Sequence, residues 1–293
     1  CVKEILDFLQ IQPGQQGLDA TLGYGGHTLE MLKCLKGEGH IYGLDVDPIE
    51  SEKTKERLKK QGFGEDILTV KLLNFRNIDQ VAEEAGKFDF VLADLGVSSM
   101  QIDNPERGFS YKVDGPLDLR MNPQKGISAA ERLKEVTQEE LYGMLLENAD
   151  EPYAEEISKA VIRQRRIRPI ETTTDLKQVI EQALSFIPEK ERKEAVKKSC
   201  QRSFQALRID VNSEFEVLYD FLDKLPQVLA PNGRTAILTF HSGEDRLVKK
   251  SFKQFYKEGI YSDICKDVIR PSQEECARNS RAKSTKMRWA IRA

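Results

Sequence analysis

The sequence predicts an α/β fold: a doubly wound, mostly parallel sheet with helices on both faces, interrupted by an inserted helical domain. Residues 17–45 read as a strand, a glycine-rich turn, a helix and a second strand, which is the βαβ unit that opens a nucleotide-binding sheet. Strand-like and helical segments then alternate up to residue 95. Strand-like runs stop from about residue 104 to 203 and resume beyond residue 204.

The composition limits the class of protein. A chain of 293 residues with 39% hydrophobic and 32% charged residues, and no long apolar run, is typical of a soluble globular protein rather than an integral membrane or disordered one. The 45 basic and 48 acidic side chains give a net charge of −3, so any nucleic-acid contact is expected to be local. Five cysteines without a C-x-x-C pair or a histidine cluster indicate no disulfide framework and no metal site.

The first part of the chain supplies most of the expected sheet. An amphipathic helical pattern covers residues 2–9, and because the chain opens on Cys1 we expect its native start to be missing. A helix is expected over residues 28–35. Strands are expected at 17–20, 40–45, 67–72 and 88–95. The last of these is an apolar run ending in Asp94, as a buried parallel strand would.

The middle of the chain predicts a helical insertion at residues 104–203, between a core domain formed by residues 1–103 and 204–293. A loop rich in proline and glycine (104–126) is followed by helices expected at 128–148, 151–166, 172–186 and 189–198. The core is expected to resume with a helix over 212–229, a turn at 230–233 and a strand at 234–240. The tail, 265–293, mixes short apolar residues with dense positive charge, and no strand is predicted there.

A glycine-rich turn lies between the first strand and its helix. Such a turn lets backbone N–H groups approach a ligand, and a helix N-terminus favours a carboxylate or phosphate. The segment Gly23–Thr28 lacks the dinucleotide fingerprint G-x-G-x-x-G, because Thr28 occupies the third glycine position. Asp45, at the end of the second strand, is placed to bind a ribose diol. The alternatives are a simple tight turn and, for Asp45, a helix N-cap before Pro48, for which Asp47 is better placed.

Asp94 ends the next strand, at the edge of the sheet where ligands of open α/β folds bind. A carboxylate there can accept hydrogen bonds from an adenine amino group, an ammonium group or a substrate amine; otherwise it is a turn residue. Binding of an adenosine with an acidic terminus, without the third glycine, points to S-adenosylmethionine rather than NAD.

Seven motifs together resemble the bacterial 16S ribosomal RNA cytosine-N4 methyltransferases, the RsmH or MraW family. They are Asp19–His27, Asp94–Asp103, Pro105–Tyr111, Asp114–Met121, Phe204–Ile209, Val211–Glu214 and Phe240–Arg246. The resemblance runs from about residue 2 to 293. It implies a class I S-adenosylmethionine-dependent methyltransferase, a Rossmann-like doubly wound sheet with an inserted substrate-recognition domain. It further implies N4-methylation of a cytidine near the decoding site, with small-subunit ribosomal RNA or the small ribosomal subunit as partner.

The resemblance also assigns cofactor contacts: the methionine end to Gly25, Gly26 and His27, the ribose to Asp45, adenine stacking to Phe75, and the remaining polar contacts to Asp94 and Gln101. Asp94 is in addition the candidate catalytic residue, and Phe75 would otherwise belong to the core. The sequence departs from the family where it lacks a leading His-x-Pro-Val-Leu-Leu segment, at Asn148–Glu151, where a Gly-Glu-Glu turn is usual, and at Gly243, where leucine is usual. We interpret His241 as a structural histidine.

Two basic clusters are candidate phosphate contacts. One contains Arg163, Arg165 and Arg166, flanked by Lys159 and Arg168, and the other is the tail after Glu275. The alternatives are a solvated helix face and a disordered basic end. In the loop after Asp94, Phe109 and Tyr111 are placed to stack on a base drawn out of the RNA, or else to pack against the insertion.

Two other function classes stay open. A dinucleotide-dependent oxidoreductase would need the third glycine that Thr28 replaces, and a non-catalytic RNA-binding ribosome assembly factor would not need Asp45, Phe75 and Asp94 together. No hydrolase, zinc deaminase or Walker pattern is present. We expect a cytoplasmic protein, or a mitochondrial matrix protein if a transit peptide precedes this sequence. The oligomeric state cannot be predicted.

Overall fold

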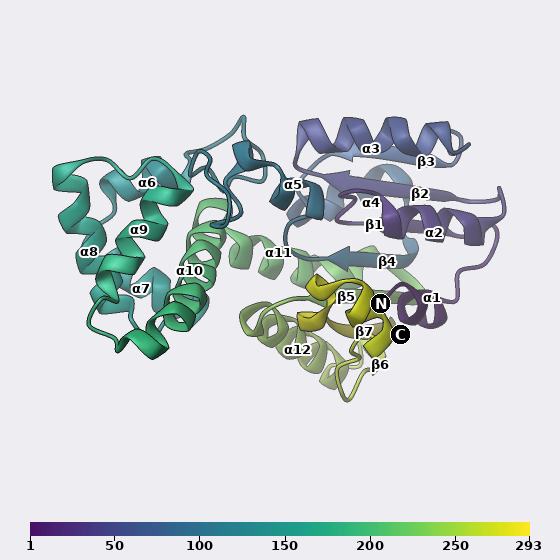
Figure 1. The fold of residues 1–293 in the computed structure, drawn as a ribbon. Coiled ribbons are helices and arrows are strands. Elements are labelled where there is room, and N and C mark those ends of the chain that lie inside the picture. The colour runs from purple at the N-terminus through teal and green to yellow at the C-terminus, as the bar shows by residue number, and fades with distance from the viewer. The chain divides into compact units, whose positions relative to one another are not determined.

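The computed structural model describes residues 1–293. The chain forms two compact units, shown in Figure 1: a sheet unit, Cys1–Gly96 with Phe215–Ala293, and a helical unit, Val97–Glu214. The predicted boundaries at 103/104 and 203/204 both fall inside the helical unit, because the helix after Asp94 and the whole of the last inserted helix pack there. No helix combines the length and the apolar character needed to cross a membrane.

The sheet unit is built on seven strands in the order β3-β2-β1-β4-β5-β7-β6. They are β1 (Gln16–Asp19), β2 (His40–Asp45), β3 (Leu68–Leu72), β4 (Phe88–Asp94), β5 (Leu229–Thr239), β6 (Tyr261–Ile264) and β7 (Lys286–Arg292). Strands β1 to β5 are parallel, while β7 runs antiparallel to both β5 and β6. The chain order reverses at β1, which has β2 on one side and β4 on the other. Ligands of such sheets bind at the carboxyl ends of the strands at this switch point.

Helices cover both faces of the sheet. They are α1 (Val2–Leu9), α2 (Gly26–Leu35), α3 (Pro48–Lys60), α4 (Ile78–Ala85), α11 (Glu214–Val228) and α12 (Ser242–Lys257), with a short α13 (Gln273–Arg278) and the 3-10 turns η1 (Phe75–Asn77) and η3 (Ser280–Ser284). Along β4, Val91 and Ala93 pack in one core with residues of α4, α11 and α12. Phe90 and Leu92 pack in the other core with residues of α1, α2 and α3. This alternation is the doubly wound arrangement that the sequence predicts.

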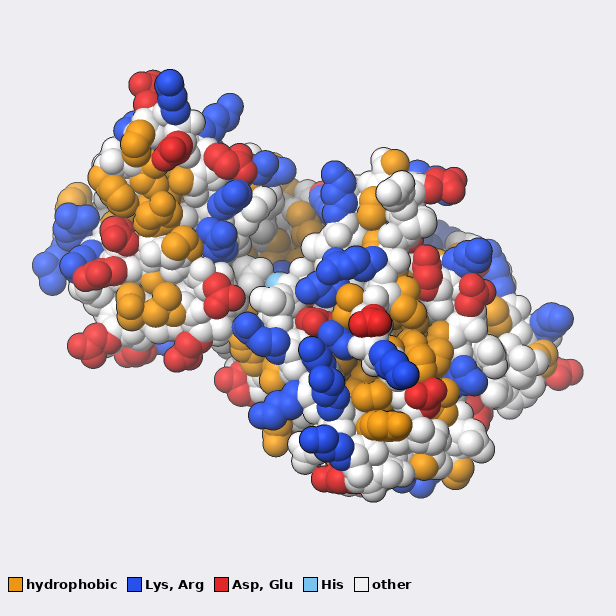
Figure 2. All heavy atoms as spheres, turned by 90° about the horizontal axis from the view of Figure 1, so that it is seen from below, with side chains coloured by type: hydrophobic (Ala, Val, Ile, Leu, Met, Phe, Trp, Pro, Cys, Tyr) orange, Lys and Arg blue, Asp and Glu red, His pale blue; other side chains and the backbone are white.

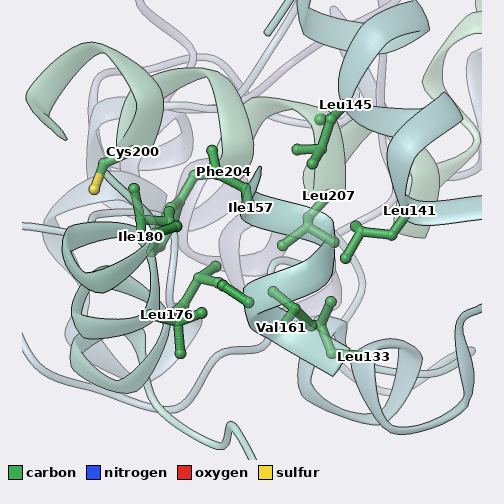
Figure 3. Packing of buried hydrophobic residues seen from close by; sticks show 14 of the residues in the cluster. Leu133, Leu141, Leu145, Ile157, Val161, Leu176, Ile180, Cys200, Phe204 and Leu207 are labelled. Carbon is green, nitrogen blue, oxygen red and sulfur yellow. The ribbon is translucent and has the colours of Figure 1, made fainter. Parts of the chain in front are cut away.

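The helical unit has its own core. Its elements are α5 (Ser99–Asp103), η2 (Pro105–Arg107), α6 (Ala129–Glu135), α7 (Gln138–Ala149), α8 (Ala154–Ile167), α9 (Thr173–Ala183) and α10 (Glu189–Asn212). Figure 3 shows how side chains of five of these helices meet, among them Leu133, Leu145, Val161, Leu176 and Leu207. A separate core of this kind is what lets the insertion fold as a compact unit.

Two helices of the insertion differ from the sequence prediction. The single helix expected over 128–148 is divided into α6 and α7, because Val136 is extended and the Thr137 hydroxyl accepts a hydrogen bond from Glu140 N, which starts a new helix. The helix expected to end at residue 198 continues to Asn212. Buried residues such as Cys200 and Phe204 continue its apolar side, and the helix ends where Ser213 adopts a left-handed conformation with φ 50°.

The end of the basic tail is part of the sheet, so the alternative of a disordered basic end is wrong. Strands β6 and β7 were not predicted. In β7 the three basic residues obscure the alternation of apolar and polar side chains that identifies a strand. Arg288 is buried in β7 and donates two hydrogen bonds, of 2.7 and 3.0 Å, to the carboxylate of Asp245 in α12. Arg292 donates to the carbonyls of Pro226 and Ile260. These two cations are structural.

Candidate cofactor and active site

Three aspartates end three neighbouring strands of the sheet unit. Asp19 ends β1, Asp45 ends β2 and Asp94 ends β4. Because these strands are parallel and adjacent, the carboxyl groups lie along one edge at the switch point. The sequence analysis singled out Asp45 and Asp94 but not Asp19.

The glycine-rich turn connects β1 to α2 at this edge. Gly25 has φ 85°, and a Cβ atom there would lie 2.7 Å from the Thr54 side chain, so the turn needs glycine. The turn is held from α3, where Arg57 donates a 2.8 Å hydrogen bond to the Tyr24 carbonyl. Gly26 has open space where a side chain would be, and no side chain caps the first N–H groups of α2. Free amides at a helix N-terminus bind a carboxylate.

Asp19 organises the base of the turn. It is only 1% exposed, and its two oxygens accept hydrogen bonds from the Thr28 hydroxyl at 2.5 Å and from Thr21 N at 3.1 Å. Burial raises the pKa of Asp19 and outweighs these hydrogen bonds. Thr28, at the third glycine position of the dinucleotide fingerprint, is therefore the hydrogen-bond donor to a buried carboxyl group. The turn lacks the glycine that a dinucleotide site has at this position. The sequence signal for this role of Asp19 was its position directly after Leu18 in the first predicted strand, just before the glycine-rich turn.

His27 and Asp94 form a pair across the turn. His27 Nε2 lies 3.1 Å from Asp94 Oδ2, and the backbone N–H of Asp94 donates a 2.6 Å hydrogen bond to the Thr21 hydroxyl. Burial lowers the pKa of His27, but the hydrogen bond and charge of Asp94, together with the charge of Asp19, outweigh it and raise the pKa overall. Both side chains stay partly exposed, at 23% and 30%. The structure thus brings together two residues that the sequence analysis assigned separately.

Asp45 points its carboxyl group at backbone N–H groups and at the edge of the sheet. One oxygen accepts a 3.0 Å hydrogen bond from Asp47 N. Asp47, not Asp45, is the N-cap of α3, since its carboxylate accepts from Ile49 N and Glu50 N. Burial raises the pKa of Asp45 to about 6. A desolvated carboxyl group that is not needed as a cap is suited to receive hydroxyl donors from a ligand.

The other two predicted cofactor residues also have structural contacts. Phe75, in the turn after β3, is partly buried and packs edge-on against Phe221, with ring centroids 5.0 Å apart. Gln101 belongs to the helical unit, where its side chain accepts from Ser98 N and the Ser98 hydroxyl accepts from Gln101 N, at 3.0 and 3.2 Å. This capping box at the start of α5 is readable in the sequence as Ser-x-x-Gln, a signal that the sequence analysis missed.

The predicted RNA-contacting residues all lie in the helical unit. Phe109 and Tyr111 are partly buried against its core, and Tyr111 stacks edge-on against Phe204 at 5.9 Å, so packing against the insertion is part of their role. Arg163 and Arg166 are exposed on α8. Arg165 differs, because its guanidinium donates to the carbonyls of Leu133 and Val136 at the end of α6.

The role of His241 as a structural histidine stays a prediction, because both of its ring nitrogens are buried without a hydrogen-bond partner. His241 follows β5 as the N-cap residue of α12, and its ring lies 3.2 Å from Glu244 and 5.9 Å from the Phe215 ring centroid. A Cβ atom at Gly243 would lie 2.7 Å from the Phe215 ring, so the space that a larger residue would need is filled by that ring.

The site fits S-adenosylmethionine. The uncapped start of α2 beside Gly25 and Gly26 matches a carboxylate, and the desolvated carboxyl group of Asp45 matches the two ribose hydroxyls. Phe75 lies beyond the adjacent strand, where an adenine ring would follow. These are the residues that would hold the cofactor, which supplies an electrophilic methyl group on a sulfonium centre.

Comparison with known proteins agrees with this fit. A family model described as "MraW methylase family" matches residues 1–293. "Ribosomal RNA small subunit methyltransferase H 1" of Lachnoclostridium phytofermentans is 72% identical over 100% of this chain and 80% of its own length. The protein of the same name in Agathobacter rectalis is 69% identical over 100% of the chain and 84% of its length, and "Ribosomal RNA small subunit methyltransferase H 2" of Alkaliphilus metalliredigens is 65% identical over 100% and 84%. These relatives are bacterial, and they give no support to a mitochondrial origin.

Strand order, the reversal at β1 and the antiparallel β7 are those of the class I methyltransferase fold, as the resemblance predicts. The catalytic class and cofactor are therefore those of an S-adenosylmethionine-dependent methyltransferase. The sheet unit carries the cofactor-binding features of that class, and the family model extends through the helical unit as well. The chain belongs to the MraW methylase family.

Proposed function

We propose that this chain transfers a methyl group from S-adenosylmethionine to N4 of a cytidine in small-subunit ribosomal RNA, near the decoding site. The observation that carries the proposal is the pair His27–Asp94 at the carboxyl edge of the sheet, next to a turn suited to the methionine end of the cofactor. The relatives named as small-subunit ribosomal RNA methyltransferases support the substrate class.

The chemistry asks for placement more than for a strong base. The exocyclic amine attacks the methyl carbon as the carbon–sulfur bond breaks. The N–H groups of the amine become acidic as the new nitrogen–carbon bond forms, and the nitrogen then loses one proton. Asp94 accepts a hydrogen bond from the amine and holds the nitrogen lone pair toward the methyl group. His27 donates to the other side of the Asp94 carboxylate and keeps it oriented. The products are the N4-methylated base, S-adenosylhomocysteine and a proton.

We assign RNA binding to the helical unit, with Arg163 and Arg166 as phosphate contacts and residues 104–203 as the substrate-recognition part of the chain. Both arginines are exposed on α8. Arg165 supports the same surface from within, by closing the end of α6. Phe109 and Tyr111 shape the loop that follows α5, and a stacking role for either ring requires that it leave its present packing.

A methyl-transfer assay with tritiated cofactor on small ribosomal subunits from cells lacking the enzyme tests the proposal. We expect label in the RNA, and mass-spectrometric mapping of nucleosides should find N4-methylcytidine. Asp94→Asn should lose transfer while RNA affinity is retained. Transfer to a different base or position would contradict the substrate assignment, and RNA binding without any transfer would favour a non-catalytic assembly factor. Calorimetry with NAD, in which no binding is expected, addresses the oxidoreductase alternative.

A further inference from the structure

The sheet unit carries a basic surface that the cofactor site does not use. Helix α12 begins three residues after the end of β5 and presents five exposed cations within twelve residues: Arg246, Lys249, Lys250, Lys253 and Lys257. No acidic residue lies between Arg246 and Lys257. We call this set the α12 stripe.

The stripe follows from helix geometry. Positions 246, 249, 250, 253 and 257 recur at intervals of three and four, so their side chains share one face. The opposite face, with Val248 and Phe252, is buried in the core of the sheet unit. The acidic residues of the first turn, Glu244 and Asp245, are also buried, and Asp245 is paired with Arg288. Lys249 contributes to the lowered pKa of Asp245, but that carboxylate is already paired with Arg288, and the other four cations of the stripe have no acidic partner.

None of the five side chains forms an ion pair or a hydrogen bond in the structure, whereas Lys33 and Lys159 on two other helices pair with Glu30 and Glu155. The stripe lines an open surface hollow of about 500 Å³, together with Gln254. Figure 2, which views the molecule from the side on which α12 lies in Figure 1, shows Lys and Arg side chains gathered over this part of the surface. Like charges in a row repel one another and destabilise the folded chain. A bound polyanion would remove this repulsion.

We propose that the α12 stripe binds the phosphate backbone of the RNA substrate, as a second RNA contact carried by the sheet unit itself. This inference rests on the proposed function. The stripe spans about 16 Å at 1.5 Å per residue, which suits an extended strand with a phosphate every few ångströms rather than one small anion. It also starts at the carboxyl edge of the sheet, because α12 follows directly on β5, the neighbour of the strand that ends in Asp94.

A membrane surface is the less suitable occupant. Helices that lie in a membrane interface bury an exposed apolar face among the lipids. The apolar face of α12 is already packed against the sheet through Val248 and Phe252. The stripe can therefore offer only charge, and charge alone along one strand of phosphates is how proteins grip nucleic acid without reading sequence.

The test replaces Lys249, Lys250, Lys253 and Lys257 by Gln and leaves Arg246, which lies beside the cofactor edge. The matched control replaces four lysines of α3, Lys53, Lys55, Lys59 and Lys60, by Gln. Helix α3 belongs to the same unit, and its lysines are interspersed with Glu52 and Glu56. Both variants change the net charge by the same amount, so a general effect of charge appears equally in both.

Binding is measured with a small-subunit ribosomal RNA fragment over a range of salt concentrations. Each phosphate contact that is lost should lower the slope of log K against log salt by about 0.7–0.9 and weaken binding about 4-fold at 0.15 M salt. Loss of all four lysine contacts thus weakens binding roughly 250-fold in the α12 variant. The α3 control should stay near wild type, Lys→Arg at all four stripe positions should restore binding, and cofactor affinity by calorimetry should be unchanged in every variant.

The proposal is overturned if the α12 variant keeps the wild-type salt slope, or if it and the α3 control lose the same affinity. It is also overturned if the α12 variant loses binding to vesicles containing phosphatidylserine while RNA binding is intact. RNA binding and methyl transfer are read separately. If the wild-type chain binds RNA through the stripe but transfers no methyl group, the proposed function fails and the surface assignment stands.

Discussion

Acidification is expected to weaken cofactor binding through Asp45. Burial raises the pKa of this carboxyl group from 3.8 to about 6. The ribose hydroxyls donate hydrogen bonds, and the ionised form accepts them more strongly than the protonated form. If only the ionised form binds, affinity falls about 2-fold at pH 6 and about 11-fold at pH 5, relative to the limit at high pH.

The sign of the linkage can be worked out for the free protein as well. Because the pKa of Asp45 is higher in the folded than in the unfolded chain, the folded state holds the extra proton between pH 3.8 and about 6. The free energy of unfolding therefore falls as the pH rises through this window, by at most about 3 kcal/mol, and the penalty is constant above it. A ligand that stabilises the carboxylate offsets part of this penalty, so binding releases a proton below about pH 6.

Isothermal titration calorimetry with S-adenosylmethionine measures both quantities. Titrations between pH 5 and 8, in buffers of different ionisation enthalpy, should show release of close to one proton at pH 5 and almost none at pH 8. Asp45→Asn should bind roughly 10- to 150-fold more weakly at pH 7.5, from loss of about 1.5–3 kcal/mol, and should lose the acid limb of the profile. His27→Gln is the control, because it removes the nearby titrating histidine and should keep that limb. An acid limb that persists unchanged in Asp45→Asn would refute the reasoning.

Four further changes probe other contacts. Arg163→Gln with Arg166→Gln should lower the salt slope of RNA binding by about 1.4–1.8 and leave calorimetric cofactor affinity unchanged; an unaltered slope would exclude α8 as a phosphate contact. Arg165→Gln should instead lower the free energy of unfolding by about 1–3 kcal/mol, measured by urea denaturation, since two buried carbonyls lose their donor. Thr28→Val should cost a similar amount by leaving a buried carboxyl group without its hydroxyl donor. The stabilising effect of His27, whose pKa is raised, should be complete below about pH 6.5 and disappear at higher pH, so the melting temperatures of wild type and His27→Gln should converge as the pH rises.

Local sequence signals determined the parallel part of the fold. The strand ending in Asp94 is an apolar run, which has few alternatives to a buried parallel strand, and the strands ending in Asp19 and Asp45 were found from the strand–turn–helix–strand order around the glycine-rich turn. The glycine-rich turn and the acid at the end of β2 were readable for the same reason, because their roles depend on backbone geometry close by in sequence. The motifs that carried the family resemblance were likewise local.

Only the tertiary structure decided which charges are structural. Arg165 and Arg288 look like members of basic clusters, yet one closes the end of α6 and the other is paired with Asp245 from an element more than forty residues away. In the sequence, Thr28 indicates only that the third glycine of the dinucleotide fingerprint is absent. The structure shows that its hydroxyl donates a hydrogen bond to the buried carboxyl group of Asp19. Whether a cationic side chain is exposed or is bound to hydrogen-bond acceptors depends on residues distant in sequence. The spacing of residue types along the chain does not identify those residues. The α12 stripe shows the converse, because its lysines became a candidate surface only once the opposite face of the helix was found packed against the sheet.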